Sequence, residues 1–517
     1  MQLDQLEPKA VWAEFFEICK IPHKSGNVDA IRAFLRKRCE DRGFKCFEDG
    51  FAGNLLIVKE ADTGFENAPV ICIQGHMDMV CSKRSDNPHD FAKDPIRPRI
   101  MTVDNKQVVM ATGTSLGADD GMGLAAGLAI IFDKTLKTGK IEVLCTKDEE
   151  TTMHGVLNMS NNFITAKYLL NLDSEDVGVI TIGSAGGFCG DIILPKMETT
   201  AISAENCQCV KMRFFNLSGG HSGVDIHHYK GNAIKCLARL MTVGMKHGGK
   251  LCSVKGGVAH NAIPMDAESC MSFEGVPAEK MTEFLQVIQK IGDEIVNEYK
   301  TTDPNIKFEV SKACGSSCSS ISVQDSERVI DLLNILPSQV LRMSADVKGL
   351  TESSINVGTL KFTAEEGGKL TVLARSSINS YLDAINAQLE AICRLAKFEY
   401  VGFRDAYGGW APNPDSKLLK VTLKHYAAQM NVAPEQIKVE AIHAGLECGE
   451  LITKYHFTVG GGFDRPHHKA PPQRQRAMRD RLGGPVLRDG EERDLGAGEV
   501  ILCCNYQQLN RVQYFFG

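Results

Sequence analysis

Four short stretches of the sequence place acidic side chains and a histidine where predicted elements begin or end. The first is GHMDMV, in which His76 and Asp78 follow the apolar run 69–74. Residues i and i+2 of a strand point to the same side, so an imidazole and a carboxylate are aimed at one point. Such a pair suits a metal site or a proton relay. The structural alternative for the pair alone is a polar strand end.

Five further carboxylates stand at comparable places, one pair at the start of a predicted helix and the others directly after predicted strands. They are Asp119 and Asp120 in SLGADDGMG, Glu149 and Glu150 in CTKDEETTMHG, and Asp173 in LLNLDSED. In an open α/β sheet the carboxyl ends of parallel strands share one edge, and ligands bind there. We therefore expect one edge of the sheet to carry the histidine and several of the acids.

So many like charges in one cleft would repel one another unless a cation neutralised them. Carboxylates and neutral imidazole are the ligands of zinc and related divalent ions. Two such ions, ~3.5–4 Å apart, can share a carboxylate and activate one water, while an acid that is not a ligand acts as general base. The alternative, a solvated loop or helix cap, would have to hold at all four places. We favour the metal site.

The elements that must position these residues alternate between strands and helices. An amphipathic helix is predicted over residues 8–20, and a small-residue helix follows the turn at Asp119. Short apolar strands are predicted at 54–58, 70–74, 141–145 and 168–172. This alternation predicts an α/β fold with a mostly parallel sheet and helices on both faces.

The pattern changes near residue 186 and returns near residue 399. The stretch between them reads as strand–helix repeats of a smaller α+β unit inserted into the first domain. We predict a catalytic domain in two parts, an inserted lid domain and an atypical C-terminal tail. The predicted ranges are 1–185 and 399–468 for the catalytic domain, 186–398 for the lid and 469–517 for the tail.

Composition narrows the functional class. The chain has 517 residues and a formal net charge of −6, which gives no broad basic field for nucleic acid. No apolar stretch is long enough to cross a membrane, and the N-terminus lacks the blocks of a signal peptide. The 18 cysteines follow no disulfide or zinc-finger spacing. We therefore expect a cytoplasmic protein that binds neither nucleic acid nor a membrane.

Read together, six motifs resemble those of the aminoacyl-histidine (Xaa-His) dipeptidases. The motifs are GHMDMV, LGADDGMG, DEETTMHG, NLDSE, GGHSG and HAGLECG, in order over roughly residues 5–468. This family comprises cytosolic dinuclear-zinc peptidases with an inserted lid domain. The resemblance implies hydrolysis of dipeptides, two Zn²⁺ ions per chain with Co²⁺ or Mn²⁺ as substitutes, and a homodimer.

The resemblance also implies a role for each residue of the metal site. His76 and Asp173 would bind one zinc, with Asp78 orienting the imidazole. Asp119 would bridge the two ions, and the peptide bond after it is cis in the family. Glu150 would bind the second zinc. Glu149 would be the general base that takes a proton from the bridging water.

In the lid, the resemblance implies contacts to the substrate. His221, in NLSGGHSG, would hydrogen-bond the carbonyl oxygen as charge develops on it. Asn261 and Arg375 would contact the substrate carboxylate or carbonyl, and an arginine fork suits a carboxylate. Glu447, in HAGLECG, would bind the substrate amino group. The alternative is a satisfied turn histidine for His221 and ordinary polar surface for Asn261 and Arg375.

The C-terminal part departs from the family pattern. The stretch GGGFDRPHHKAPP keeps the spacing to His467, which we predict as the last zinc ligand, with His468 as the alternative. After Lys469 there is no lysine, and arginines crowd a Pro/Gly-rich segment, so we assign no structure to residues 469–500.

The leading hypothesis is a zinc-dependent dipeptidase with Glu149 as general base. An aminoacylase-type amide hydrolase is the alternative within the same chemistry. A metal-binding pseudoenzyme with a damaged C-terminus is the alternative from another class. Glu149 argues against the pseudoenzyme, because a binding role needs no general base.

Overall fold

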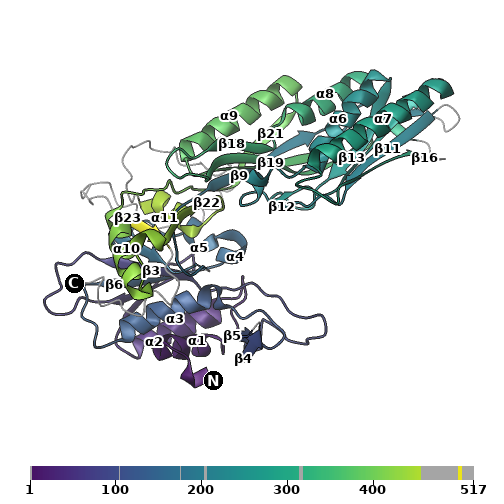
Figure 1. Ribbon diagram of the computed structural model, residues 1–517. Coiled ribbons are helices and arrows are strands. Elements are labelled where there is room, and N and C mark those ends of the chain that lie inside the picture. Colours follow the sequence, from purple (N-terminus) through teal and green to yellow (C-terminus); the bar gives the residue numbers. More distant parts are fainter. Residues whose placement is uncertain are drawn as a thin grey trace, which may run out of the picture.

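The computed structural model shows two sheets that lie end to end, each with its own helices (Figure 1). It describes residues 3–103, 105–174, 176–202, 207–313, 318–455 and 499–502. Within that part of the chain, none of the helices is both long and apolar enough to cross a bilayer. His76 lies at the end of a strand of the first sheet, and Arg375 lies on a strand of the second.

The first sheet has six strands in the order β1-β2-β6-β3-β7-β23, of which β6, β3, β7 and β23 are parallel. The two antiparallel strands, β1 and β2, lie at one edge. All residues of β3 and β6 are buried, as expected for parallel strands covered on both faces. In chain order the strands are β1 Lys45–Glu48, β2 Leu55–Lys59, β3 Ile71–His76, β6 Ile141–Thr146, β7 Tyr168–Asn171 and β23 Glu499–Leu502.

Helices cover both faces of this sheet because successive strand residues alternate between the faces. On β2, Leu55 and Ile57 belong to the core beneath α1, α2 and α3, whereas Leu56 and Val58 belong to the core beneath α5 and α11. The predicted α/β fold and its four apolar strands are confirmed. The helices are α1 Lys9–Ile18, α2 Asp29–Glu40, α3 Ala118–Phe132, α5 His154–Leu157, α10 Lys417–Met430 and α11 Glu447–Tyr455.

The second sheet is antiparallel, and its helices lie on one face (Figure 1). Its strand order is β16-β11-β15-β13-β19-β20-β9-β21, with β18 paired to β19. One continuous apolar core fills the space between sheet and helices. The strands are β9 Gly186–Leu194, β11 Cys207–Phe215, β13 Gly249–Gly256, β15 Ala267–Glu274, β16 Lys307–Ala313, β18 Gln339–Met343, β19 Thr351–Thr363, β20 Gly367–Ser376 and β21 Glu399–Tyr407; the helices are α6 Ala233–Lys246, α7 Ala278–Tyr299, α8 Val323–Ile335 and α9 Asn379–Ala396.

Four short two-stranded pairs complete the described structure. Two of them matter for the site: β12 with β14, which holds the lid turn, and β8 with β22, which lies between the two sheets. The pairs are β4 Pro98–Val103 with β5 Lys106–Ala111, β8 Val179–Ser184 with β22 Lys438–Ile442, β10 Thr199–Ile202 with β17 Cys318–Ile321, and β12 Gly220–His221 with β14 Ala262–Ile263.

The chain crosses from one sheet to the other twice, and the two crossings are hydrogen-bonded to each other. Ser184 and Trp410 each donate a backbone N–H to the other's carbonyl oxygen, at 2.9 Å in both directions. Strand β21 extends the second sheet to Tyr407 by pairing with β9. The division into domains at residues 185 and 398 stays a prediction.

Candidate metal centre and active site

His76 is the last residue of β3, and its ring is fixed at the carboxyl edge of the first sheet. The imidazole is 1% exposed. Its Nδ1 lies 2.9 Å from the backbone oxygen of Asp78, an acceptor that only an N–H can serve. Nδ1 therefore carries a proton, and Nε2 is the ring nitrogen that faces the acids. Nε2 lies 2.8 Å from Asp119 Oδ1 and 3.9 Å from Asp173 Oδ2.

The carboxylate of Asp78 holds the segment that carries the two glutamates. It accepts hydrogen bonds from Ser25 Oγ at 2.8 Å, from the Glu149 N–H at 3.0 Å and from the Glu150 N–H at 3.3 Å. Burial alone would raise the pKa of Asp78, but His76 and these donors outweigh it and hold the pKa below its ordinary value. A buried anion thus fixes the first turn of α4, Glu149–Thr152.

The turn into α3 presents Asp119 to His76 and turns Asp120 away. The peptide bond between the two aspartates is cis, as the family resemblance implied. Asp120 is buried and accepts hydrogen bonds from the N–H groups of His76 and Gly123, at 3.2 and 3.1 Å. A Cβ at Gly75 or Gly123 would lie 2.1 or 2.2 Å from an Asp120 carboxylate oxygen, so both positions require glycine.

These elements bring five of the predicted residues into one cluster. The ligand atoms of His76, Asp119 and Glu150 lie within 4.8 Å of one another. The same limit holds for His76, Glu149 and Asp173. An imidazole nitrogen and carboxylate oxygens at these separations are suitable ligands for zinc and related divalent cations.

The electrostatics of the cluster also fit a cation. Burial and the neighbouring acids Glu447 and Asp173 raise the pKa of Glu149 to about 9. Burial, with Asp119 and Glu447 nearby, raises the pKa of Asp173 to about 7. A bound cation would relieve this repulsion and favour the charged form of each acid.

Glu447, the first residue of α11, lies against the same cluster. It is buried, and its Oε2 accepts hydrogen bonds from Gln74 Nε2 at 2.6 Å and Thr146 Oγ1 at 2.7 Å. Its Oε1 is buried and has no hydrogen-bond partner among the described residues. Burial raises the pKa of Glu447 to about 7. A buried oxygen without a donor is suited to receive one from a ligand.

Two buried amides that the sequence analysis did not single out connect Glu447 to Asp173. Gln74 Oε1 accepts from Asn171 Nδ2 at 2.6 Å, and Asn171 Oδ1 accepts from the Asp173 N–H at 2.9 Å. Gln74 and Asn171 stand at the ends of the apolar runs of β3 and β7. An amide in a buried strand needs a specific partner, and this was the signal that could have identified them.

The predicted lid residues form a second cluster on the second sheet. His221 Nε2 lies 3.3 Å from Arg375 Nη2, and Arg375 Nη1 donates to Tyr407 Oη at 2.8 Å. Burial and the positive charge of Arg375 lower the pKa of His221, which favours the neutral ring. Tyr407 is a further site residue that the sequence analysis missed. In the sequence, Tyr407 is marked by the Gly-Gly pair that follows it at 408–409, and this is a weak signal of function.

Asn261 and His443 lie beside His221. Asn261 is exposed, and its backbone oxygen accepts the Ser222 N–H at 2.8 Å. His443 is buried, with Nε2 2.7 Å from Ser354 Oγ, and burial together with Arg375 and His221 lowers its pKa to about 3. Predicted residue His467 and its alternative His468 lie outside the described residues.

Comparison with known proteins gives two extensive matches, although no family model matches the chain. The chain is 34% identical over 475 residues to the cytosol non-specific dipeptidase of Escherichia coli (strain K12), covering 90% of this chain and 94% of that protein. It superposes with a TM-score of 0.78 on the crystal structure of aminoacylhistidine dipeptidase from Vibrio alginolyticus, at 33% identity. That match covers 88% of this chain and 90% of the other.

The metal-free protein should lose stability as the pH rises. In the unfolded chain Glu149, Asp173 and Glu447 ionise near their ordinary pKa values of 4.5 or 3.8, whereas in the folded protein their pKa values are about 9, 7 and 7. The folded state therefore binds protons that the unfolded chain has released, so deprotonation favours unfolding. The lowered pKa values of the histidines His23, His221 and His443 oppose this trend only below their ordinary value of 6.5. We therefore expect the Tm of chelator-treated protein, measured by calorimetry, to fall from about pH 6.5 to about pH 8.

The other titrating residues of the cluster do not reverse this trend. The raised pKa of His76 acts in the same direction, and the stabilisation from the lowered pKa values of Asp78 and Asp119 is complete above their ordinary value of 3.8. Added Zn²⁺ should raise the Tm more at the higher pH, because it replaces the lost protons. A metal-free Tm that rises across this range, with no response to Zn²⁺, would contradict the cation site.

Proposed function

This chain belongs to the family of the cytosol non-specific and aminoacyl-histidine dipeptidases, and we propose that it is a metallopeptidase of the cytosol that hydrolyses dipeptides. The observation that carries the proposal is the cluster of His76, Asp119, Glu149, Glu150 and Asp173 at the carboxyl edge of the first sheet. The 34% identity extends over both the sheet that bears this cluster and the sheet that bears the lid residues.

Four residues of the cluster would hold two zinc ions, with Co²⁺ or Mn²⁺ as substitutes. His76 and Asp173 would serve one ion, Glu150 and His467 the other, and Asp119 both. Bound there, the ions would polarise a water molecule and the carbonyl group of the scissile bond. The orientation of His76, with Nδ1 bonded to a backbone oxygen and Nε2 directed at Asp119, supports this assignment.

Glu149 is the proposed general base. Its backbone N–H donates a hydrogen bond to the buried Asp78 carboxylate, and this hydrogen bond fixes the position of Glu149. Burial raises its pKa, which makes the carboxylate a stronger proton acceptor than an exposed glutamate. Having taken a proton from the attacking water, the same carboxyl can donate it to the departing amino group.

The substrate's two ends would be recognised by the other predicted residues. The free Oε1 of Glu447 is a buried acceptor for the substrate's ammonium group. Arg375 is 4% exposed, and its Nε is a buried donor with no partner in the described structure, which suits the substrate's carboxylate. Asn261, beside His221, would add a polar contact. His221 would donate to the carbonyl oxygen as charge develops there.

We also propose a homodimer in which the lid histidine serves the partner's site. In this chain His221 and Arg375 form a cluster of their own on the second sheet, whereas the acids cluster on the first. A second copy of the chain would bring a lid to a metal centre. Beyond the second subunit and the metal ions, the proposed activity requires only the peptide substrate.

Glu149→Gln should separate metal binding from catalysis. The amide keeps the size of the side chain but cannot act as a base, so kcat on dipeptides should fall by at least ~10² while the metal content stays at the wild-type value. Elemental analysis and steady-state kinetics on a panel of Xaa-His and other dipeptides measure both quantities. The matched control is Glu150→Gln, which should lower the metal content.

Near-normal turnover by fully metallated Glu149→Gln protein would exclude Glu149 as the base. The same panel should include dipeptides acetylated at the amino end. Hydrolysis of the acetylated compounds in preference to the free ones would indicate an aminoacylase instead of a dipeptidase.

His221→Ala should lower kcat much more than it raises KM. Loss of a donor to the developing charge should cost on the order of 3 kcal/mol of transition-state stabilisation. The exposed His228, seven residues along the same turn, provides the control, and His228→Ala should retain activity. A change confined to KM would make His221 a ground-state contact.

Subunit mixing extends this experiment to the dimer. Equal amounts of inactive Glu149→Gln and inactive His221→Ala protein, dissociated and reassembled, should regain about a quarter of wild-type activity if His221 serves the partner's site. Half of the dimers would then be mixed, and one of their two sites would be complete. A monomeric mass by light scattering, or no regained activity from verified mixed dimers, would contradict the arrangement.

His467→Ala should remove one of the two zinc ions and most of the activity, because the second ion would keep carboxylate ligands but no imidazole. His468→Ala is the matched control and should be nearly silent. Metal content per chain, measured on both purified variants, decides between them. A His467→Ala protein with two zinc ions and full activity would exclude His467 as a ligand.

A further inference from the structure

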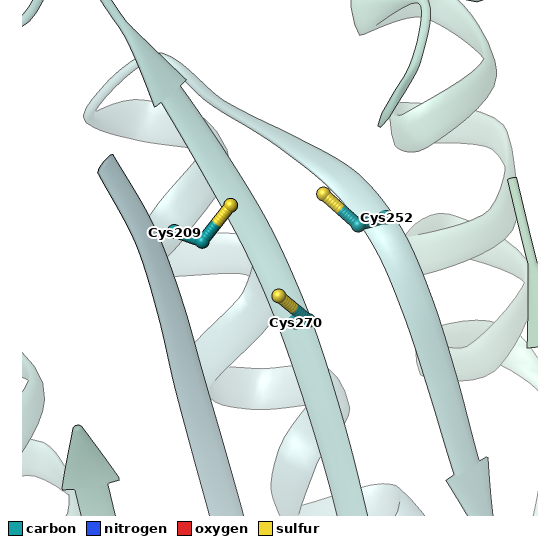
Figure 2. A group of neighbouring side chains, drawn as sticks. All are labelled: Cys209, Cys252 and Cys270. Carbon is teal, nitrogen blue, oxygen red and sulfur yellow. The ribbon is translucent and has the colours of Figure 1, made fainter. Parts of the chain in front are cut away.

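Three cysteines gather on neighbouring strands of the second sheet, far along the chain from the acids of the metal cluster. They are Cys209 on β11, Cys252 on β13 and Cys270 on β15, and β15 lies between the other two strands (Figure 2). Their sulfur atoms all lie within 4.8 Å of one another. No residue of the proposed peptidase site belongs to this group.

The strand register explains why the cysteines share one face of the sheet. Met271 and Phe273 on β15 point into the apolar core beneath the helices, so Cys270, which directly precedes Met271, points to the other face. On β11, Val210 and Met212 point into the same core, which places Cys209 on the face of Cys270.

A β-bulge in β13 brings Cys252 close to Cys209 and Cys270. Leu251 is paired with Met271 and Ser253 with Cys270, so Cys252 is the extra residue between two successive pairs. A bulge re-aims the side chain of the extra residue and interrupts the hydrogen-bond ladder. The Cys252 side chain is thereby placed next to that of Cys270 and not on an opposite pleat (Figure 2).

Cys252 and Cys270, which are not in disulfides, differ in their surroundings. Cys252 is 7% exposed, whereas Cys270 is partly exposed and lies directly opposite Lys211 on β11. The hydrogen bond from Cys252 and the ammonium of Lys211 lower the pKa of Cys270. Thiolate is the reactive form of cysteine, so Cys270 is the nucleophile of the pair and Cys252 its neighbour. Cys209 is held in a disulfide and supplies no thiol.

We propose that Cys252 and Cys270 form a peroxide-sensitive dithiol that closes to a disulfide. The Cys270 thiolate attacks one oxygen of hydrogen peroxide, the O–O bond breaks, and the departing hydroxide takes a proton to give water and a Cys270 sulfenic acid. The Cys252 sulfur then attacks the Cys270 sulfur, the S–O bond breaks, and a second water leaves. Two thiols lose two electrons to one peroxide, which yields one disulfide and two waters.

The test is peptide mapping of the full-length protein. After treatment with stoichiometric hydrogen peroxide, free thiols are alkylated and the protein is digested without reductant. We expect a peptide pair linked through Cys252 and Cys270. Cys252→Ser should leave a sulfenic acid at Cys270 that a carbon nucleophile such as dimedone traps, and Cys270→Ser should leave Cys252 as a thiol.

Cys81 provides the control for accessibility, because it is an exposed thiol whose pKa burial raises. Its replacement by serine should leave the Cys252–Cys270 link unchanged. Both lid variants should keep wild-type dipeptidase activity, which shows that they are folded. The proposal is overturned if no such link forms, if Cys81 oxidises before Cys270, or if the link that forms instead joins Cys39 to Cys46, which are hydrogen-bonded to each other.

Discussion

The buried carboxylate of Asp78 is the interaction on which the arrangement of the metal cluster depends. It joins three segments that are remote in the sequence: the loop with Ser25, the end of β3 with His76, and the start of α4. Helix α4 has only four residues, too few to be stable by itself. Its direction, and hence the direction of the Glu149 and Glu150 side chains, is therefore set by the anion that accepts their backbone N–H groups.

Hydrogen bonds between buried polar groups also position the other acids of the cluster. Glu149, Glu150 and Asp173 are each positioned by a hydrogen bond that the backbone N–H of the residue donates. Asp173 is positioned through its N–H by Asn171, and Asn171 through Gln74 by Glu447. These contacts hold several carboxylates close together in a buried site, and burial together with the neighbouring like charges raises the pKa values of Glu149, Asp173 and Glu447. The carboxyl edge of the first sheet is therefore suited to bind a cation.

The cluster of acids at the carboxyl edge of the first sheet could be predicted from the sequence because it depends on two simple features. Apolar runs end at His76, Glu149 and Asp173, and the carboxyl ends of parallel strands must meet. The four strands were placed to within one or two residues. The cis bond at Asp119 came from the family resemblance and not from the residues themselves.

What local pattern could not predict was contact between distant segments. Gln74 and Glu447 are 373 residues apart, and no periodicity in either stretch indicates their hydrogen bond. Tyr407 beside Arg375 and the bulge at Cys252 depend on the register of the antiparallel sheet. Register is fixed by the packing of whole strands, so a single sequence carries little information about it.

One segment connects the two clusters physically. His443 lies with His221 and Arg375, whereas Glu447, four residues later, lies with Gln74 and the acids. The backbone oxygen of His443 would be 2.1 Å from a Cβ at position 223, so the His221 turn approaches this segment at a distance that only Gly223 permits. The turn that carries His221 thus packs against the backbone of the segment that also carries Glu447, and this contact within one chain joins the two clusters.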